Sequence, residues 1–399
     1  MSVRVPIYLD HQATTPCDPR VVEAMRPFWS EEFGNAASKT HALGWKAEQA
    51  VEDGRGRLAE LIGADPREII FTSGATESNN LAILGLARAN RDRGRHVVSL
   101  ETEHRSVLDP CRALEREGFR VTLLPVGNNG ILDLDRLRDA LDDETVLISI
   151  LHANNEIGVI QPLAEIGEIA RARRIPVHTD AAQSAGKLEI DVRTLGVDLL
   201  SFTAHKLYGP KGIGALWLRR GSPRLRLEPI LHGGGHERGL RSGTLPVPLC
   251  VGFGRACELA GELRTEDARR EAQLAERLWK RLSTELEAVE LNGDAVHRLP
   301  GNLNISFLGV EGEALLIALP KLALSAGSAC TSASREPSHV LRALGIGETR
   351  ALCSLRFGFG RSTSEAEIDL AADLLIEQVT RLRALSPVWE RAKRGGDGP

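Results

Sequence analysis

Residues 175–217 read IPVHTDAAQSAGKLEIDVRTLGVDLLSFTAHKLYGPKGIGALW and contain three short apolar runs, each followed by polar or glycine-rich residues. These runs are rich in β-branched residues and are too short for typical helices, so they predict strands over 175–180, 197–203 and 214–220. The first ends at Asp180, and Lys206 closely follows the second. Since the two are one βαβ step apart, we expect a carboxylate and an amine at neighbouring strand ends of one sheet.

The alternation of strand and helix signals extends through the first 260 residues or so and predicts a doubly wound α/β domain with a mostly parallel sheet. After the Gly/Pro-rich stretch 232–248, the pattern changes to one long amphipathic helix and then to a smaller α+β domain. We expect a large domain over 16–260, and a small domain built from 1–15 and 261–399. The other expected strands are 68–72, 96–100, 120–126, 145–152, 302–308 and 354–360, and the expected helices are 78–90, 107–118, 133–141, 163–174, 249–288, 312–322 and 364–385.

The composition excludes several classes of protein. A chain of 399 residues with 42% hydrophobic and 26% charged residues is globular, and it is longer than the ~250–300 residues that one core usually serves. The net charge of −4 gives no electrostatic reason to bind nucleic acid or an anionic membrane. No apolar run could cross a bilayer and no signal peptide begins the chain, so we expect a cytoplasmic protein. The six cysteines form no CxxC pair, which disfavours a disulfide framework and a zinc site.

Polar residues at the predicted strand ends suggest a cofactor site. Ala75 and Thr76 begin a helix whose free N–H groups suit a phosphate, although an ordinary capped turn would look the same. His104 could stack on a ring or act as a base, and Asn155 could donate a hydrogen bond, but an inert histidine and a plain loop asparagine fit equally well. Among eight lysines, Lys206 is the best placed to be desolvated and nucleophilic.

Together, the polar residues at these strand ends indicate a particular cofactor more specifically than any one of them does alone. Asp180 lies where burial is costly unless a cation is near. A lysine able to form a Schiff base, an aspartate able to pair with a pyridinium nitrogen and a phosphate cradle are together what pyridoxal 5′-phosphate requires.

Three further features lie outside this group. Cys330 falls in SAGSACTSAS, a run of small polar residues over about 325–335 that we expect to be a mobile, exposed loop. Arg356 is expected within a strand, where it could bind a substrate carboxylate or form a structural ion pair. His232 and His236 are separated by three glycines, which argues against a metal-binding helix and leaves residues 232–244 as a candidate phosphate loop or subunit contact.

The chain resembles the NifS/IscS-type cysteine desulfurases of the housekeeping iron–sulfur-cluster branch, over about residues 5–391. The resemblance is carried by YLDHQATTP, FTSGATESNN, ETEHRSVLD, HANNEIGVIQ, HTDAAQSAGK, AHKLYGPKGIGAL, HGGGHERGLRSGTLP and the long loop SAGSACTSAS. It implies a fold-type I, class-V aminotransferase homodimer that uses pyridoxal 5′-phosphate, takes sulfur from L-cysteine and releases L-alanine. The sulfur would pass to an iron–sulfur scaffold protein or another acceptor, for cluster assembly or thiolation.

The resemblance also implies residue roles. Lys206 would bind the cofactor covalently, His104 would stack on its ring and help to move protons, Asp180 would pair with the pyridinium nitrogen, and Gln183 would bond the ring hydroxyl. Cys330 would be the nucleophile that becomes a persulfide, and could transiently ligate a cluster in a complex, whereas no metal is expected in the free enzyme. Asn155 and Arg356 would bind the substrate carboxylate. The phosphate would be held by Ala75, Thr76, Thr203, His205 and, from the other subunit, Thr244.

Two departures from the family pattern stand out. Thr203 is commonly serine, which preserves the hydroxyl. The chain ends at VWERAKRGGDGP, without the longer extension that housekeeping members use to dock the scaffold, so we do not expect scaffold docking by that route. Two other functions remain open. One is that of a related class-V enzyme, either a selenocysteine lyase or an aminotransferase, and an aminotransferase would not need Cys330. The other is that of a sulfur carrier or assembly partner with little turnover of its own.

Overall fold

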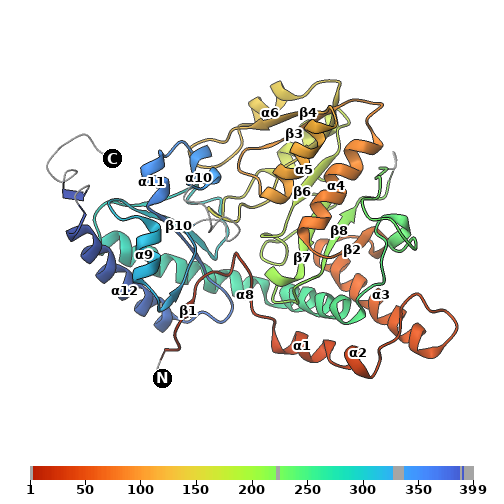
Figure 1. Ribbon diagram of the computed structural model, residues 1–399, viewed down its shortest axis with the longest axis horizontal. Coiled ribbons are helices and arrows are strands. Elements are labelled where there is room, and N and C mark those ends of the chain that lie inside the picture. The colour runs from red at the N-terminus through yellow and green to blue at the C-terminus, as the bar shows by residue number, and fades with distance from the viewer. Residues whose placement is uncertain (1–2, 222–224, 327–336, 387–388, 391–399) are drawn as a thin grey trace.

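The computed structural model describes residues 3–221, 225–326, 337–386 and 389–390. It confirms the α/β prediction, with a seven-stranded sheet in the order β2-β8-β7-β6-β5-β3-β4 (Figure 1). Strand β8 runs antiparallel to both of its neighbours, and the other pairs are parallel. The strands are β2 (Ile69–Thr72), β3 (His96–Leu100), β4 (Arg120–Leu124), β5 (Thr145–Ser149), β6 (Val177–Asp180), β7 (Leu199–Thr203) and β8 (Gly214–Leu218).

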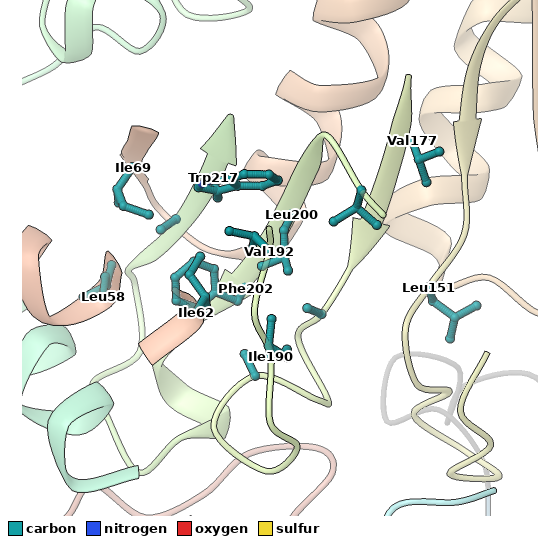
Figure 2. Close-up of a cluster of buried hydrophobic side chains, with 14 of the residues drawn as sticks. Leu58, Ile62, Ile69, Leu151, Val177, Ile190, Val192, Leu200, Phe202 and Trp217 are labelled. Carbon is teal, nitrogen blue, oxygen red and sulfur yellow. The ribbon is translucent and has the colours of Figure 1, made fainter. Parts of the chain in front are cut away.

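Both faces of this sheet are covered by helices, because successive strand residues point to opposite faces. Ile69 and Phe71 pack in one apolar cluster, and Ile70 packs in the other. The first cluster includes residues of α3 (Ala42–Ile62), α6 (Leu134–Ala140), α7 (Leu163–Ala172) and α8 (Val247–Glu285), and Figure 2 shows part of it around Phe202 and Trp217. The second includes residues of α4 (Ala75–Ala89) and α5 (Arg105–Arg116).

Helix α3 was not expected from the sequence, because glycines and charged residues interrupt its apolar positions. Its buried face includes Val51, Leu58 and Ile62, at the spacing of a helix. Gly54 is explained by packing, since a Cβ added at Gly254 of α8 would lie 2.7 Å from the Gly54 Cα. The two helices therefore cross at a pair of glycines. Two short helices precede α3, namely α1 (Pro19–Met25) and α2 (Pro27–Ser30).

A third apolar cluster lies around the small sheet, which has three antiparallel strands in the order β12-β10-β9. Helix α8 links the two parts of the molecule (Figure 1). Its Phe253 packs in the first cluster, and its Leu278 packs in the third. The division into domains at 16–260 and at 1–15 with 261–399 stays a prediction. The other helices and strands of this part include β9 (Val289–Leu291), β10 (Asn302–Phe307), β12 (Ser354–Gly358), α9 (Gly312–Ala318), α10 (His339–Ala343), α11 (Glu348–Leu352) and α12 (Glu365–Ala384).

The N-terminal segment lies between these two parts. Strand β1 (Ile7–Tyr8) pairs in parallel with β11 (Leu322–Ala323), and the Gly358 N–H donates to the Leu9 carbonyl at 2.7 Å. Residues 10–15 then continue to the carboxyl edge of the large sheet. Among the described residues, no helix has the length and apolar character needed to span a membrane.

Candidate active site

A cavity of about 500 Å³ opens at the carboxyl edge of the large sheet. A cavity of about 580 Å³ lies at the opposite edge, and none of the expected site residues lines it. Thr244 is exposed in the loop before α8 and does not line the first cavity, and Cys330 lies outside the described residues. Ten expected residues do line the first cavity: Ala75, Thr76, His104, Asn155, Asp180, Gln183, Thr203, His205, Lys206 and Arg356.

The amino end of α4 forms one wall, where the first N–H groups of the helix have no intrahelical acceptor. The start of β8 approaches it so closely that a Cβ at Gly214 would lie 2.6 Å from the Gly74 Cα, which requires glycine there. Arg241 of the glycine-rich loop pairs with Glu77 at 2.8 Å. Burial would raise the pKa of Glu77, but the hydrogen bonds from Arg241 and Ser73 outweigh it and lower the pKa. The ion pair with Arg241 balances the charge of Glu77, so the free N–H groups at this end of α4 can hold an anion.

A chain of hydrogen bonds joins Asp180 to His104. Asp180 Oδ2 accepts from Asn79 Nδ2 at 2.7 Å, and the same amide donates to Ser106 Oγ at 2.8 Å. Ser106 Oγ lies 2.8 Å from His104 Nδ1, and the Ser106 N–H donates to that nitrogen, so Nδ1 is an acceptor. Burial is the largest cause of a lowered pKa at His104, although Asp180 opposes it. The ring is therefore held neutral and in one orientation.

Lys206 ends a short 3₁₀ turn, Ala204–Lys206, directly after β7. The N-terminal segment fixes this turn, because Thr15 Oγ1 donates to the His205 carbonyl at 2.9 Å and accepts from the Tyr208 N–H at 2.8 Å. His205 Nδ1 also lies 3.0 Å from Thr14 Oγ1. The sequence thus correctly predicted Lys206 at a strand end, and the structure adds the threonines that fix its turn.

Gln183 provides a test of whether pyridoxal phosphate fits. Its Nε2 donates to the Gln12 carbonyl at 2.9 Å, whereas its buried Oε1 has no partner among the described residues. A polar atom left unpaired beside a cavity is typical of a site completed by a ligand. With a carboxylate at Asp180, an amine at Lys206 and a helix amino end at Ala75, the donor set fits that cofactor.

Arg356 forms a structural ion pair, which was one of the two roles expected for it from the sequence. Its NH2 forms an ion pair with Asp10 Oδ1 at 2.6 Å, and its NH1 donates to the Asn155 carbonyl at 3.0 Å. The side chain is only 1% exposed, and its Nε has no partner among the described residues. Because one donor remains unpaired at the cavity wall, substrate binding by Arg356 stays a prediction beside the ion pair.

Comparison with known proteins gives the family. Residues 7–370 match the family described as aminotransferase class-V. This chain belongs to the class-V aminotransferases. The resemblance to NifS/IscS-type cysteine desulfurases is confirmed, and proteins of this family generally depend on pyridoxal phosphate.

Relatives align along almost the whole chain. A protein named cysteine desulfurase IscS from Colwellia psychrerythraea is 55% identical over 99% of this chain and 98% of its own length. A mouse (Mus musculus) protein named cysteine desulfurase is also 55% identical, over 98% of this chain and 85% of its own length. A solved NifS-like protein superposes with a TM-score of 0.88 at 35% identity, over 94% and 99% of the two chains. A structure titled SspA in complex with cysteine has a TM-score of 0.79 at 38% identity, over 88% and 98%.

In this class-V chain, the described cysteines have the character of structural thiols. Burial raises the pKa of Cys111 to about 12, and it also raises the pKa of Cys250 and Cys257. Burial is the main cause of a raised pKa at Cys17 and Cys353 as well. None of these five described cysteines is therefore suited to form a thiolate near neutral pH.

Several residues that organise this class-V site were missed from the sequence. They are Asp10, Gln12, Thr14, Asn79 and Ser106, and all are polar and lie within the motifs YLDHQATTP, FTSGATESNN and ETEHRSVLD. The only sign of them in the sequence was that they lie within long polar runs, which are longer than a turn requires. Apart from the bond between Ser106 and His104, their partners are distant in sequence, so only the fold reveals what they bond.

Proposed function

We propose that this chain is a pyridoxal-5′-phosphate-dependent cysteine desulfurase that converts L-cysteine to L-alanine. It would hold the sulfur as a persulfide on Cys330 and pass it to acceptor proteins for iron–sulfur cluster assembly or thiolation. The observation that carries the proposal is the meeting of Lys206, Asp180, His104 and the amino end of α4 around one cavity. A homodimer and a cytoplasmic location are parts of the same proposal.

The residues would hold the cofactor as follows. Lys206 binds it covalently, Asp180 pairs with its ring nitrogen, and Gln183 bonds its ring hydroxyl. The cofactor supplies an electron sink for negative charge at the substrate α-carbon. Its phosphate is held at the amino end of α4 and by hydroxyl and imidazole groups, from Ala75, Thr76, Thr203, His205 and Thr244 of the partner subunit.

The protein's own groups then act on the substrate. Arg356 and Asn155 orient the cysteine carboxylate, and Lys206 and His104 move protons. His104 is kept neutral by burial and carries its proton on Nε2, because Nδ1 accepts from Ser106. The Cys330 thiolate attacks the substrate Sγ, and a new S–S bond forms while the Cβ–S bond breaks. The electron pair stays with carbon and a proton is added at Cβ, so the carbon skeleton leaves as alanine and Cys330 carries the persulfide.

The exposed position of Thr244 supports the dimer, because this residue does not line the cavity of its own chain. The raised pKa values of the five described cysteines support Cys330 as the nucleophile.

Product analysis tests the proposal. Cofactor-loaded protein is incubated anaerobically with L-cysteine and a thiol reductant, and sulfide and alanine are quantified for the wild type and Cys330→Ala. We expect equal yields in the wild type and neither product in the variant, while the cofactor absorbance of the variant still responds to cysteine. Sulfide from the variant would overturn the role of Cys330, and a wild type that never makes alanine would overturn desulfuration.

A further inference from the structure

The first turn of α10 makes two polar contacts with the large-sheet part of the molecule. Ser338, the N-cap of α10, donates from Oγ to Glu156 Oε2 at 2.5 Å. His339 Nε2 lies 2.9 Å from the Glu103 carbonyl oxygen, so this nitrogen carries a proton and donates. Apolar packing of Val340 and Leu341 fixes the rest of the helix.

Both acceptors adjoin residues of the cavity. Glu103 immediately precedes His104 in the loop after β3, and Glu156 immediately follows Asn155 in the loop after β5. Two consecutive residues, the N-cap and the first residue of α10, therefore contact the neighbours of a predicted proton carrier and of a predicted substrate ligand.

These two loops form a firm support. The Glu103 carboxyl accepts from the Leu151 N–H at 2.6 Å, and Asn154 Nδ2 donates to the Thr102 carbonyl at 2.9 Å. Asn154 Oδ1 also accepts from the Glu156 N–H at 2.8 Å. Because the loops are bonded to each other, a contact with both fixes α10 in position and in orientation.

Covalent geometry links this contact to the sulfur chemistry. Ser338 follows Cys330 by eight residues, and eight residues span at most roughly 28 Å. Wherever Ser338 is held, Cys330 is confined to a sphere of that radius, so the local concentration of its thiol at the cavity depends on the anchor.

We propose that Ser338 and His339 are positioning residues for sulfur transfer, because they anchor the carboxyl-terminal end of the Cys330 segment to the loops that carry His104 and Asn155. The proposal rests on the proposed function and assigns this anchor to one step, the attack of Cys330 on the substrate sulfur. Neither residue touches the reacting atoms in this role.

His339 also acts on His104 through charge. The groups that influence the His104 pKa, besides its burial, are Asp180 and Asp109, which raise it, and Lys206 and His339, which lower it. Removing the His339 imidazole should therefore raise the His104 pKa. The acid limb of the pH profile for persulfide formation should then move to higher pH. A residue needed only for folding would not cause such a shift.

The test is a single turnover with the cofactor-loaded full chain in excess over ³⁵S-labelled cysteine, in which protein-bound persulfide is followed by rapid quench and cofactor absorbance by stopped flow. In His339→Phe we expect persulfide formation to slow about tenfold, a fraction of the ~10²-fold that a 1 Å misplacement can cost. The absorbance change on cysteine binding should stay within about twofold. His339→Gln keeps an N–H donor but has no charge, so it should restore the rate but not the pH midpoint.

Ser338 and Glu156 allow a second, independent test. Ser338→Asp keeps a good N-cap but sets a carboxylate against Glu156, so persulfide formation should slow. Adding Glu156→Gln supplies an amide donor to that carboxylate and should recover the rate in the double variant. If the single and double variants are equally slow, the Ser338–Glu156 contact is not part of the anchor.

The outcomes separate this inference from the proposed function. His297→Phe, which removes an exposed histidine far along the chain from α10, is the matched control and should behave as the wild type. If the wild type forms no persulfide, the proposed function fails. If the wild type forms persulfide and His339→Phe forms it equally fast with the same pH midpoint, only the anchor is overturned.

Discussion

The two walls of the cavity are held by different kinds of contact. On the large-sheet wall, apart from the Arg241–Glu77 ion pair, neutral side chains orient the charged group: Asn79 and Ser106 connect Asp180 to His104. On the wall formed by the small sheet and the N-terminal segment, Arg356 is held by the opposite charge of Asp10. A lost neutral donor costs one hydrogen bond, whereas a lost counter-ion leaves a buried charge unpaired. Substitutions in the two walls should therefore have different effects: loss of a neutral donor should weaken cofactor binding, and loss of the counter-ion should lower the free energy of unfolding.

The largest effect is expected on the large-sheet wall at Lys206. Lys206→Ala removes the amine expected to bind the cofactor and to move a proton, so kcat/KM should fall by ~10³-fold or more. Lys211→Ala is the matched control, because Lys211 lines the same cavity from an exposed turn, and its kcat/KM should change less than tenfold or so. Steady-state alanine release measures both. Comparable losses in the two variants would contradict the assignment of Lys206.

The next effect tests the charged wall. Asp10→Ala leaves Arg356 buried without its counter-ion, so the free energy of unfolding should fall by about 3–5 kcal/mol. Urea unfolding followed by circular dichroism measures the change. Asp109→Ala removes an exposed carboxylate that also pairs with an arginine, Arg112, and should cost less than ~1 kcal/mol. A small cost at Asp10 would mean that the two walls do not differ.

A smaller effect is expected for the neutral network. Asn79→Ala removes the amide that bonds Asp180 and Ser106, worth about 1.5–3 kcal/mol for a bond to a charged group. Cofactor affinity should weaken about 10- to 100-fold, as measured by titrating absorbance and activity with pyridoxal phosphate. Asn80→Ala alters the next residue, whose amide donates to the Thr76 carbonyl in an exposed hydrogen bond, and should leave the affinity nearly unchanged. Equal losses would point to damage of α4 rather than of the network.

The smallest effect, taken per pH unit, is a dependence of stability on pH beside the charged wall. Burial is the main cause that raises the pKa of Glu271 to about 7, and Lys187 opposes it. Between the ordinary carboxyl pKa and pH 7, the folded state keeps a proton that the unfolded state has lost, so this group lowers stability as pH rises. Relative to Glu271→Gln, the wild type should lose up to ~1.4 kcal/mol of unfolding free energy per pH unit in that range. Glu266→Gln, at an exposed position of the same helix, should show no such difference.

Residues at strand ends could be predicted from sequence, and contacts between distant segments could not. Asp180 and Lys206 follow apolar runs whose length and composition identify them as strands, and the carboxyl edge of an α/β sheet then brings them together. Helix α3 was missed because its glycines serve a close crossing with α8, which has no signature in the helix itself. The ion pair of Arg356 with Asp10 joins residues 346 positions apart, so the sequence pattern indicated a need for an anion without identifying it.

The path of the N-terminal segment sets an order on the making of this protein at the ribosome. The strands of the large sheet are complete once residue 218 has been synthesised, yet Ile7 and Leu9 bond to Lys321, Ala323 and Gly358. The first residues to leave the exit tunnel are thus among the last to reach all of their partners, and Asp10 cannot pair with Arg356 of the cavity wall until nearly the whole chain has been made. A nascent chain that stalls before residue 358 would contain every strand of the large sheet but would lack a finished catalytic centre.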